Sequence, residues 1–236
     1  MERQKSKYYK KTAVISGGSG YVGSAIARQL SADGFKVALL YFGAVESDVE
    51  KIIASLNGQG HKAYRCDIRD ETEVNNAIKK IAEDFGEIDA CIHAAESKIN
   101  RSFLRELSGS QFRRQFEAGV FGGFNFMKAC ASYMKKSGGV IIGITSSSAK
   151  SGSVYGKMGA YVTAKYALSG LLRALAKELA SDNIWVHEVA PGFLRGGLNK
   201  DLPAEISEFL SKKNDSGYPS SVENVAKMVA LLCSEN

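Results

Sequence analysis

The sequence predicts an α/β protein built on a doubly wound parallel sheet with helices on both faces. Short apolar runs alternate with segments of helical periodicity along the chain, and this alternation is typical of right-handed βαβ units. The first apolar run ends in a glycine-rich turn that leads directly into a helical pattern. A chain of 236 residues has room for one substantial core, and its length gives no reason to divide it. We therefore expect a single domain.

The predicted strands are apolar runs that suit burial on both faces of a parallel sheet. They cover residues 12–16, 36–41, 62–67, 88–93, 140–145 and 185–189. The predicted helices carry apolar residues at helical spacing. They cover residues 24–30, 48–57, 70–85 and 111–135, followed by a helix that contains Tyr161 and Lys165 and ends near residue 181. We expect the helix of residues 111–135 to kink near Gly119, Gly122 and Gly123.

Residues 1–11 form a basic tail, and residues 12–236 form the expected domain. The tail contains five basic residues and one acid, for a net charge of +4: Arg3, Lys5, Lys7, Lys10, Lys11 and Glu2. The whole chain has a net charge of +6, so the domain keeps only about +2, too little for a nucleic-acid platform. The least regular segment, residues 193–218, lies beyond the sixth strand, and we expect it to form a lid over a substrate.

The chain shows no sign of membrane or metal binding. No apolar run is long enough to cross a bilayer, and residues 1–5 lack the apolar segment of an export signal, so we expect a cytoplasmic protein. The cysteines are far apart, with no histidine at ligand spacing: Cys66, Cys91, Cys130 and Cys233. This spacing predicts buried reduced thiols and no metal site.

A dinucleotide site is predicted where the first strand meets the first helix. Glycines allow the backbone to approach a pyrophosphate closely, and the helix N-terminus offers unpaired N–H groups and a favourable dipole. The strand, glycine turn and helix follow one another in the order that such a site requires. The predicted phosphate-binding residues are Gly17, Ser19, Gly20, Tyr21, Val22 and Gly23.

A candidate acid/base pair lies further along the chain. Tyr161 and Lys165 are four residues apart on one predicted helix, so their side chains project from the same face. A nearby ammonium lowers the pKa of a phenol from its usual value of about 10, which suits general acid/base chemistry. Two residues on a solvated helix face would have the same spacing. The hydroxyl-rich run at residues 145–148 precedes the pair.

Taken in order, the glycine turn, the serine run, the Tyr161-x-x-x-Lys165 pair and Pro191-Gly192 resemble the short-chain dehydrogenase/reductase family. The resemblance extends from about residue 11 to residue 235 and is greatest toward reductases of 3-oxoacyl groups and related carbonyl compounds. It implies a Rossmann-like fold and a homodimer or homotetramer. The chain stops at residue 236, before the last strand usual in the family, so we expect that strand to be missing and one sheet edge to be exposed or covered by a partner.

The resemblance implies roles for three catalytic residues. Tyr161 would be the general acid in reduction and the base in oxidation, and Lys165 would bind the nicotinamide ribose and lower the pKa of Tyr161. Ser146 would hold the substrate carbonyl oxygen. Ser147 and Ser148 are alternatives for that role, and capping of the strand end is the competing interpretation, favoured for Ser148.

The resemblance also implies the rest of the cofactor site. Asp67 would bind the adenine, with Ile68 beside the ring, although Asp67 could equally cap the next helix. The second strand ends in Tyr41 and Phe42, with neither an acid that would select NAD nor a nearby arginine that would select NADP. The missing acid favours NADP(H) over NAD(H). The other cofactor residues implied are Ala94, Ala95, Tyr161, Lys165, Pro191 and Gly192.

Several positions depart from the family pattern. The family's Asn-Asn-Ala-Gly is His93-Ala94-Ala95-Glu96 here, and we expect His93 to be a hydrogen-bonded strand-end residue and Glu96 to face solvent. The asparagine of the family's proton relay aligns with Gly119, and the threonine expected at the nicotinamide aligns with Gly196. Tyr21 stands where single-domain members have glycine.

Two functions follow from these observations. The first is an NAD(P)(H)-dependent oxidoreductase that interconverts a carbonyl and an alcohol on a small or acyl substrate. Retention of Ser146, Tyr161 and Lys165 favours it. The alternative is a divergent member that binds a dinucleotide or metabolite as a sensor, or performs non-redox isomerase or lyase chemistry. Gly119, Gly196 and the other departures favour this alternative.

Overall fold

The computed structural model describes residues 11–134, 138–150, 156–212 and 221–234. Its core is a six-stranded sheet in the order β3-β2-β1-β4-β5-β6, and every neighbouring pair of strands is parallel. The strands are β1 Thr12–Ser16, β2 Lys36–Tyr41, β3 Lys62–Arg65, β4 Ala90–His93, β5 Gly139–Ile144 and β6 Ile184–Val189. The prediction of a doubly wound parallel sheet is therefore confirmed.

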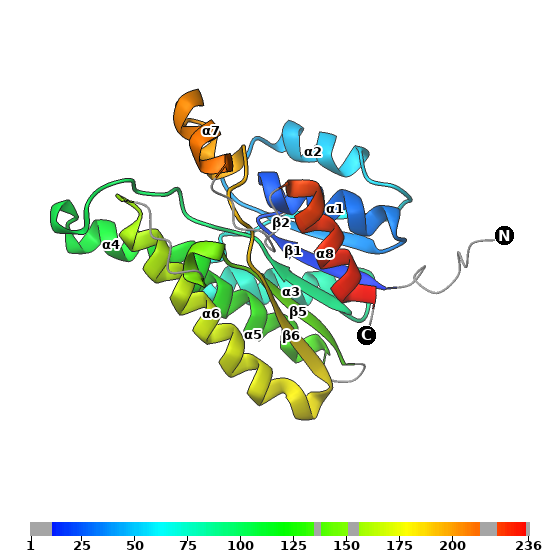
Figure 1. The fold of residues 1–236 in the computed structure, drawn as a ribbon. Helices are drawn as coiled ribbons and strands as arrows, with labels where there is room; N and C mark the ends of the chain where they lie inside the picture. The colour runs from blue at the N-terminus through cyan, green and yellow to red at the C-terminus, as the bar shows by residue number, and fades with distance from the viewer. Residues whose placement is uncertain (1–10, 135–137, 151–155, 213–220, 235–236) are drawn as a thin grey trace.

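Helices cover both faces of the sheet (Figure 1). One face packs against α1 Tyr21–Ala32, α2 Glu46–Ala54 and α8 Val222–Ser234, and the other against α3 Glu71–Phe85, α5 Gly123–Met134 and α6 Gly159–Leu179. Each layer buries its own cluster of aliphatic side chains against the sheet. Alternate residues of the strands supply the two clusters, because successive side chains point to opposite faces. This explains why the strands read as continuous apolar runs.

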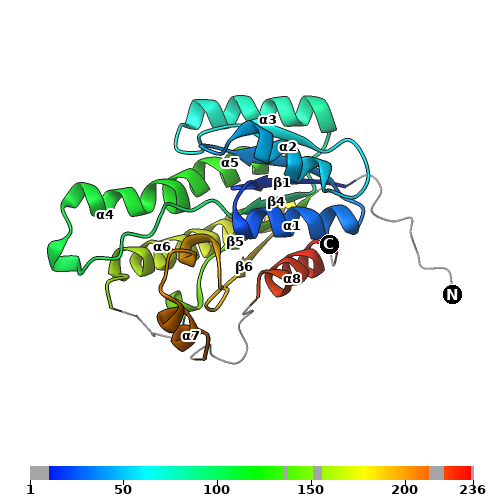
Figure 2. The same cartoon turned by 90° about the horizontal axis from the view of Figure 1, so that it is seen from above.

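The order of the strands creates a switch point between β1 and β4. From β1 the sheet continues through β2 to β3 on one side, and from β4 it continues through β5 to β6 on the other side. Ligands in such sheets bind beyond the carboxyl ends of the strands at this point. The chain that leaves β4 leads to α4 Gly109–Phe116, and the chain that leaves β6 leads to α7 Ala204–Lys212. Figure 2 shows both helices standing away from the sheet.

The predicted helix of residues 111–135 is interrupted where its glycines lie. It consists of α4, a π-helical segment Glu117–Gly122 (η2) and α5. Without a Cβ, Gly122 and Gly123 allow Ile68 and His93 to approach the backbone, since a Cβ on either would lie 2.7 Å from those side chains. The interruption thus brings the helix close to the ends of β3 and β4.

The sequence predicts no regular structure in the proposed lid at 193–218. The structure shows helix α7 there, beginning directly after Pro203. Proline suits the start of a helix because backbone N–H groups there have no partner within the helix, so the N–H that proline lacks is not missed. Residues 213–218 lie outside the described part of the chain, as do the tail residues 1–10. The third predicted strand was too long, because β3 ends at Arg65.

The described residues can be searched for membrane-spanning helices, metal ligands and disulfides. None of the described helices is long and apolar enough to cross a membrane, and no cluster of three potential metal ligands occurs among these residues. All four cysteines are buried free thiols, as the sequence indicated. Within this part of the chain, β6 is the last strand and forms one edge of the sheet.

Candidate active site

A cavity of about 980 Å³ opens at the carboxyl ends of the strands. It is lined by the glycine turn, the ends of β2, β4 and β5, the start of α6 and the segment that follows β6. All but one of the predicted site residues line it: Gly17, Ser19, Gly20, Tyr21, Val22, Tyr41, Phe42, Asp67, Ile68, Ala94, Ala95, Ser146, Tyr161, Lys165, Pro191 and Gly192. The exception is Gly23.

The glycine turn is closed by tight backbone packing. Gly17 has a φ of +67°, and a Cβ there would lie 2.7 Å from the backbone of Ala95. Gly23 serves packing instead of lining the cavity, because its Cβ would overlap the carbonyl of Gly17. Gly20 caps α1 without a side-chain hydrogen bond. The first N–H groups of α1 are thus available for an anion, as a pyrophosphate site requires.

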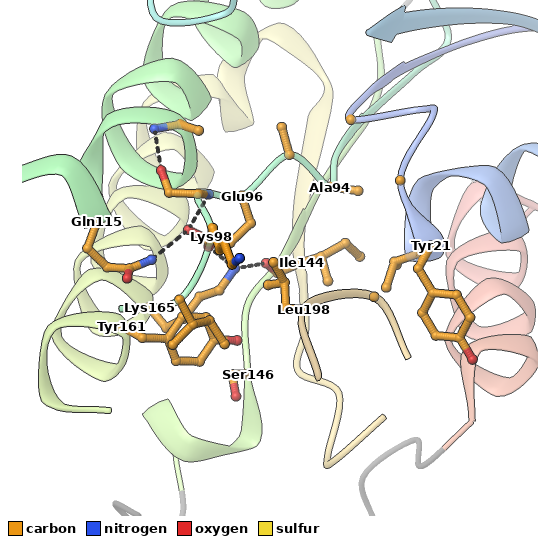
Figure 3. A pocket seen from close by; sticks show the side chains of 18 of the residues that line it. Tyr21, Ala94, Glu96, Lys98, Gln115, Ile144, Ser146, Tyr161, Lys165 and Leu198 are labelled. Carbon is orange, nitrogen blue, oxygen red and sulfur yellow. Dashed lines mark hydrogen bonds and ion pairs between the residues drawn. The ribbon is translucent and has the colours of Figure 1, made fainter. Parts of the chain in front are cut away.

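Tyr21 extends from this turn (Figure 3) and contacts the segment after β6. Its hydroxyl donates to the carbonyl of Arg195 at 3.3 Å. Its side chain lies so close to Gly196 and Gly197 that a Cβ on Gly196 would be 2.8 Å from the ring and a Cβ on Gly197 would be 2.9 Å from Tyr21 Cβ. The glycine at position 196 is therefore explained by Tyr21: the two departures from the family pattern fit each other.

At the Asp67 end of the cavity, the structure excludes one of the two roles that the sequence left open for this residue. Asp67 does not cap α3, since Asp70 accepts the hydrogen bonds from Thr72 N and Glu73 N at 2.8 and 3.0 Å. Asp67 instead pairs with Arg69, with 2.6 Å between Oδ2 and Nη2. Hydrogen bonds from Arg69 lower the pKa of Asp67 more than burial raises it.

Arginines also stand at the end of β2, where the sequence showed none. The guanidinium groups of Arg65 and Arg69 lie 5.5 and 5.4 Å from the centre of the Phe42 ring, within cation–π range. They come from β3 and the turn after it. Because both lie far from Phe42 in the chain, the sequence near Phe42 does not indicate that they are neighbours. Strand pairing between β2 and β3 brings them together.

Ser146, Tyr161 and Lys165 meet at the opposite side of the cavity. Ser146 lies two residues beyond the end of β5, and its Oγ accepts from Ser148 N at 3.3 Å. A hydrogen bond with Ser146 lowers the pKa of Tyr161. All three side chains are buried, with at most 9% of each residue exposed. Lys165 Nζ donates to the carbonyl of Ile144 at 2.8 Å and lies 5.7 Å from the centre of the Tyr161 ring.

Glu96 was expected to face solvent, and this expectation was wrong. Its side chain is only 7% exposed, and its Oε2 lies 2.7 Å from Lys165 Nζ. Its Oε1 accepts from Ser97 N at 2.9 Å and from Gln115 Nε2 at 3.5 Å. Figure 3 shows the carboxylate directed from the end of β4 toward Lys165. Only the three-dimensional contact reveals this pair, because the two residues are far apart in the chain.

The Glu96 contact changes the electrostatics of Tyr161 and Lys165. Burial raises the pKa of Tyr161, Lys165 lowers it, Glu96 raises it, and Ser146 and Arg101 lower it, so that the pKa lies above its usual value. Burial lowers the pKa of Lys165, but Glu96 and Tyr161 raise it, and the net shift is upward. The sequence prediction that Lys165 alone would leave the pKa of Tyr161 below its usual value thus omitted burial and Glu96.

His93 has the structural role that the sequence suggested. It is fully buried, with Ser16 Oγ 2.8 Å from Nδ1 and the carbonyl of Gly119 3.0 Å from Nε2. A carbonyl only accepts, so Nε2 carries the proton and Nδ1 accepts from Ser16. Burial lowers the pKa of His93 to about 4, so the ring is neutral at physiological pH.

Known proteins resemble the chain over nearly its whole length. The family model described as enoyl-(acyl carrier protein) reductase matches residues 19–236. A 3-oxoacyl-[acyl-carrier-protein] reductase of Mus musculus is 31% identical, covering 83% of this chain and 80% of the relative. An L-2,3-butanediol dehydrogenase of Corynebacterium glutamicum is 30% identical, covering 96% and 92%.

A 3alpha-hydroxysteroid dehydrogenase of Mediterraneibacter gnavus is 29% identical, covering 95% of this chain and 90% of the relative. The solved structure of NAD+-bound xylitol dehydrogenase shares the fold, with a TM-score of 0.85, 23% identity and coverage of 97% and 94%. The fold, the cavity and these matches agree on one assignment. The chain belongs to the short-chain dehydrogenase/reductase family and is an NAD(P)-dependent oxidoreductase of that type.

Proposed function

We propose that this oxidoreductase interconverts a carbonyl and an alcohol on a small or acyl substrate, with Tyr161 as the proton donor in reduction and acceptor in oxidation. The observation that carries the proposal is the meeting of Tyr161, Ser146 and Lys165 at one wall of the cavity. A buried phenol beside a serine hydroxyl and an ammonium is suited to protonating a nascent alkoxide.

The cavity fits a nicotinamide dinucleotide at its other wall. The uncapped start of α1 and the Gly17 turn would hold the pyrophosphate, and Pro191 and Gly192 would border the nicotinamide. When bound, the nicotinamide supplies or accepts the hydride. Lys165 donates one N–H to the carbonyl of Ile144 and forms an ion pair with Glu96, and an ammonium has three N–H donors, so one would be available for a ribose hydroxyl.

The proton steps belong to the chain's own residues. Ser146 donates to the substrate oxygen and orients it toward Tyr161. In reduction the Tyr161 hydroxyl gives its proton to that oxygen, and in oxidation the phenolate takes it back. Lys165 stabilises the phenolate by its charge. Because the pKa of Tyr161 is raised, the neutral form persists to high pH, which favours the role of proton donor over that of base.

We also propose a preference for NADP(H) over NAD(H). The second strand ends without an acid that would repel a 2′-phosphate. Arg65 and Arg69 stand beside Phe42 at that end, and guanidinium groups bind phosphate well. Asp67 already holds Arg69, so Arg65 is the arginine that we expect to contact the phosphate directly.

Two contacts support a lid role for the segment that begins at Phe193. Arg101 Nη2, on the segment after β4, donates to Asn199 Oδ1 at 2.7 Å, and Tyr21 donates to Arg195 O. The lid would thus be attached to both walls of the cavity. A substrate that enters between them would be shielded from water, which strengthens hydrogen bonds to the reacting oxygen.

A homodimer or homotetramer in the cytoplasm completes the proposal. Its support is a set of exposed aromatic side chains on neighbouring elements: Phe121 on η2, Phe124 on α5 and Tyr166 on α6. Exposed apolar patches often mark contacts between subunits. Analytical ultracentrifugation tests the oligomeric state, and a monomer over the whole concentration range would contradict it.

One observation favours the alternative function, dinucleotide binding without redox turnover. Glu96 balances the charge that would otherwise lower the pKa of Tyr161. With a raised pKa, less of Tyr161 is ionised near neutral pH, and a smaller phenolate fraction would slow oxidation. Under this alternative, the protein would bind a dinucleotide tightly and turn over none of a broad panel of carbonyls and alcohols.

The first experiment is a titration with NADPH and NADH, followed by a turnover panel. The panel contains acetoacetyl-CoA, 2,3-butanedione and a 3-oxosteroid, which represent the substrate classes named for the relatives. We expect NADPH oxidation with at least one of them. Tyr161→Phe should lower turnover by at least about a hundredfold, the typical contribution of a general acid, while leaving NADPH affinity unchanged. Full activity in this variant would reject the role assigned to Tyr161.

A further inference from the structure

The Glu96–Lys165 ion pair is an unusual arrangement for an acid/base site. The two side chains are 7% and 5% exposed, so water screens their attraction weakly. Removing one partner of a buried pair leaves an uncompensated charge, and a pair in this position is correspondingly hard to break. Glu96 Oε2 has no partner with hydrogen-bond geometry among the described residues, so its 2.7 Å ion pair with the Lys165 ammonium is the contact that balances its charge.

Other contacts hold the carboxylate in place. Glu96 Oε1 accepts from Ser97 N and from Gln115 Nε2. Gln115 is 2% exposed, and its own Oε1 accepts from Asn100 N at 3.1 Å. The orientation of Glu96 is therefore fixed from α4 and from the segment after β4. This leaves Oε2 aimed at Lys165.

Gly119 provides the space that Glu96 occupies. A Cβ on Gly119 would lie 2.7 Å from Glu96 Oε2 and 2.9 Å from Oε1, closer than van der Waals contact allows. Any side chain at position 119 would push the carboxylate away from Lys165. His93 holds the backbone here through the Gly119 carbonyl, and the π-helical turn of η2 places that backbone against Glu96.

We propose that Glu96 is a positioning residue of this site, which holds the Lys165 ammonium in place and balances its charge beside Tyr161, in a space that exists because residue 119 is glycine. The inference rests on the proposed function, since it assigns a role to the partner of the proposed proton donor. It explains two departures from the family pattern as one compensating pair.

The charges that act on Tyr161 come from several elements. Lys165 lies on the same helix, Ser146 follows β5, and Glu96 and Arg101 lie on the segment after β4. His93 also faces Lys165, but its pKa of about 4 makes it neutral near pH 7. Of these groups, Glu96 is the only described acid that acts on Tyr161. Its removal should therefore stabilise the phenolate.

The first test is a double-mutant cycle in urea unfolding with Glu96→Gln and Lys165→Met. Each single variant leaves one partner without its counterpart, whereas the double variant leaves neither charge. We expect the effects to be coupled by more than about tenfold in the unfolding equilibrium constant. Additive effects would overturn the proposal.

The second test measures Tyr161 ionisation without turnover. The tyrosinate absorbance of each protein is compared with that of the same protein carrying Tyr161→Phe, so the difference reports Tyr161 alone. At about pH 10, within the range where circular dichroism shows the fold intact, Glu96→Gln should raise the tyrosinate fraction about tenfold, the effect of one nearby charge. A purely structural role for Glu96 predicts no change, and that result would refute the proposal.

The third test uses glycine variants. Gly119→Ala should destabilise the protein and raise the Tyr161 ionised fraction as Glu96→Gln does, because the methyl group displaces the carboxylate. Gly170→Ala is the matched control, since nothing lies within 4 Å of a Cβ at this position on α6. In a Glu96→Ala background, Gly119→Ala should become as harmless as the control. A Gly119→Ala protein that behaves like Gly170→Ala with Glu96 present would contradict the space argument.

The outcomes separate this inference from the proposed function. None of the three tests requires a substrate, so coupling between Glu96 and Lys165 can be found even if the carbonyl panel gives no turnover. Turnover without coupling would leave the proposed function standing and reject the role of Glu96.

Discussion

Protonation of His93 should make the protein less stable in mild acid. The ring is fully buried, and burial lowers its pKa from 6.5 to about 4. In the unfolded chain the same ring is exposed to water and has its ordinary pKa of 6.5. The folded-state pKa is depressed, so the stability that His93 contributes is present above 6.5 and is lost as the pH falls toward 4.

The size of this loss follows from proton linkage. With a folded pKa of about 4 and an unfolded value of 6.5, lowering the pH from about 8 to about 5 removes about 2 kcal/mol of unfolding free energy. The loss matters for the site, because His93 ties Ser16 on β1 to the carbonyl of Gly119. That carbonyl belongs to the turn that makes room for Glu96.

Urea unfolding at the two pH values measures the effect in the wild type and in His93→Gln. Glutamine does not titrate, so the variant should lose about 2 kcal/mol less than the wild type on acidification, whatever its stability at neutral pH. His187→Gln is the control, because His187 on β6 is only partly buried, and its pH dependence should match the wild type. Equal losses in wild type and His93→Gln would refute the reasoning.

Three further predictions concern cofactor choice, the Tyr21 contact and helix α3. Arg65→Gln should lower the ratio of NADPH to NADH affinity about tenfold by removing a guanidinium near the expected 2′-phosphate, and an unchanged ratio in a binding titration would argue against that contact. Gly196→Ala should cost about 1–3 kcal/mol in urea unfolding, because its φ is +145° and its Cβ would meet the Tyr21 ring; the cost should shrink in a Tyr21→Ala background, and an equal cost there would exclude the steric explanation. Asp70→Ala should lower stability by about 1 kcal/mol, since Asp70 caps α3, whereas Asp67→Ala should leave helix capping unaffected; the reverse ranking in thermal unfolding would restore Asp67 as the cap.

The strands and the shared helix face of Tyr161 and Lys165 were accessible to sequence reasoning because local chemistry determines them, whereas the proposed role of Ser146 came from the family resemblance. Runs such as residues 140–144 are apolar throughout, which is the pattern of a strand buried on both faces. Tyr161 and Lys165 lie on one helix, so their spacing alone places them on the same side. The glycine turn is equally local, since Gly17 and Gly23 meet within one strand–turn–helix unit.

Other features depended on contacts between distant segments, and no local pattern of residues indicated them. Phe42 and Arg65 meet only because β2 pairs with β3. The helix α7 carries a single buried residue, Leu210, so its apolar pattern was too weak to distinguish it from a loop.

By itself the sequence determined the parallel sheet, the glycine turn and the shared helix face of Tyr161 and Lys165, because short-range periodicity and spacing specify these, and the family resemblance added Ser146. Only the tertiary structure decided that Glu96 turns inward to Lys165 and that Gly119 makes room for it. The physical reason is that a carboxylate at a strand end is stable in solvent or in a buried ion pair. The choice between the two depends on a cation and a space supplied by helices elsewhere in the chain.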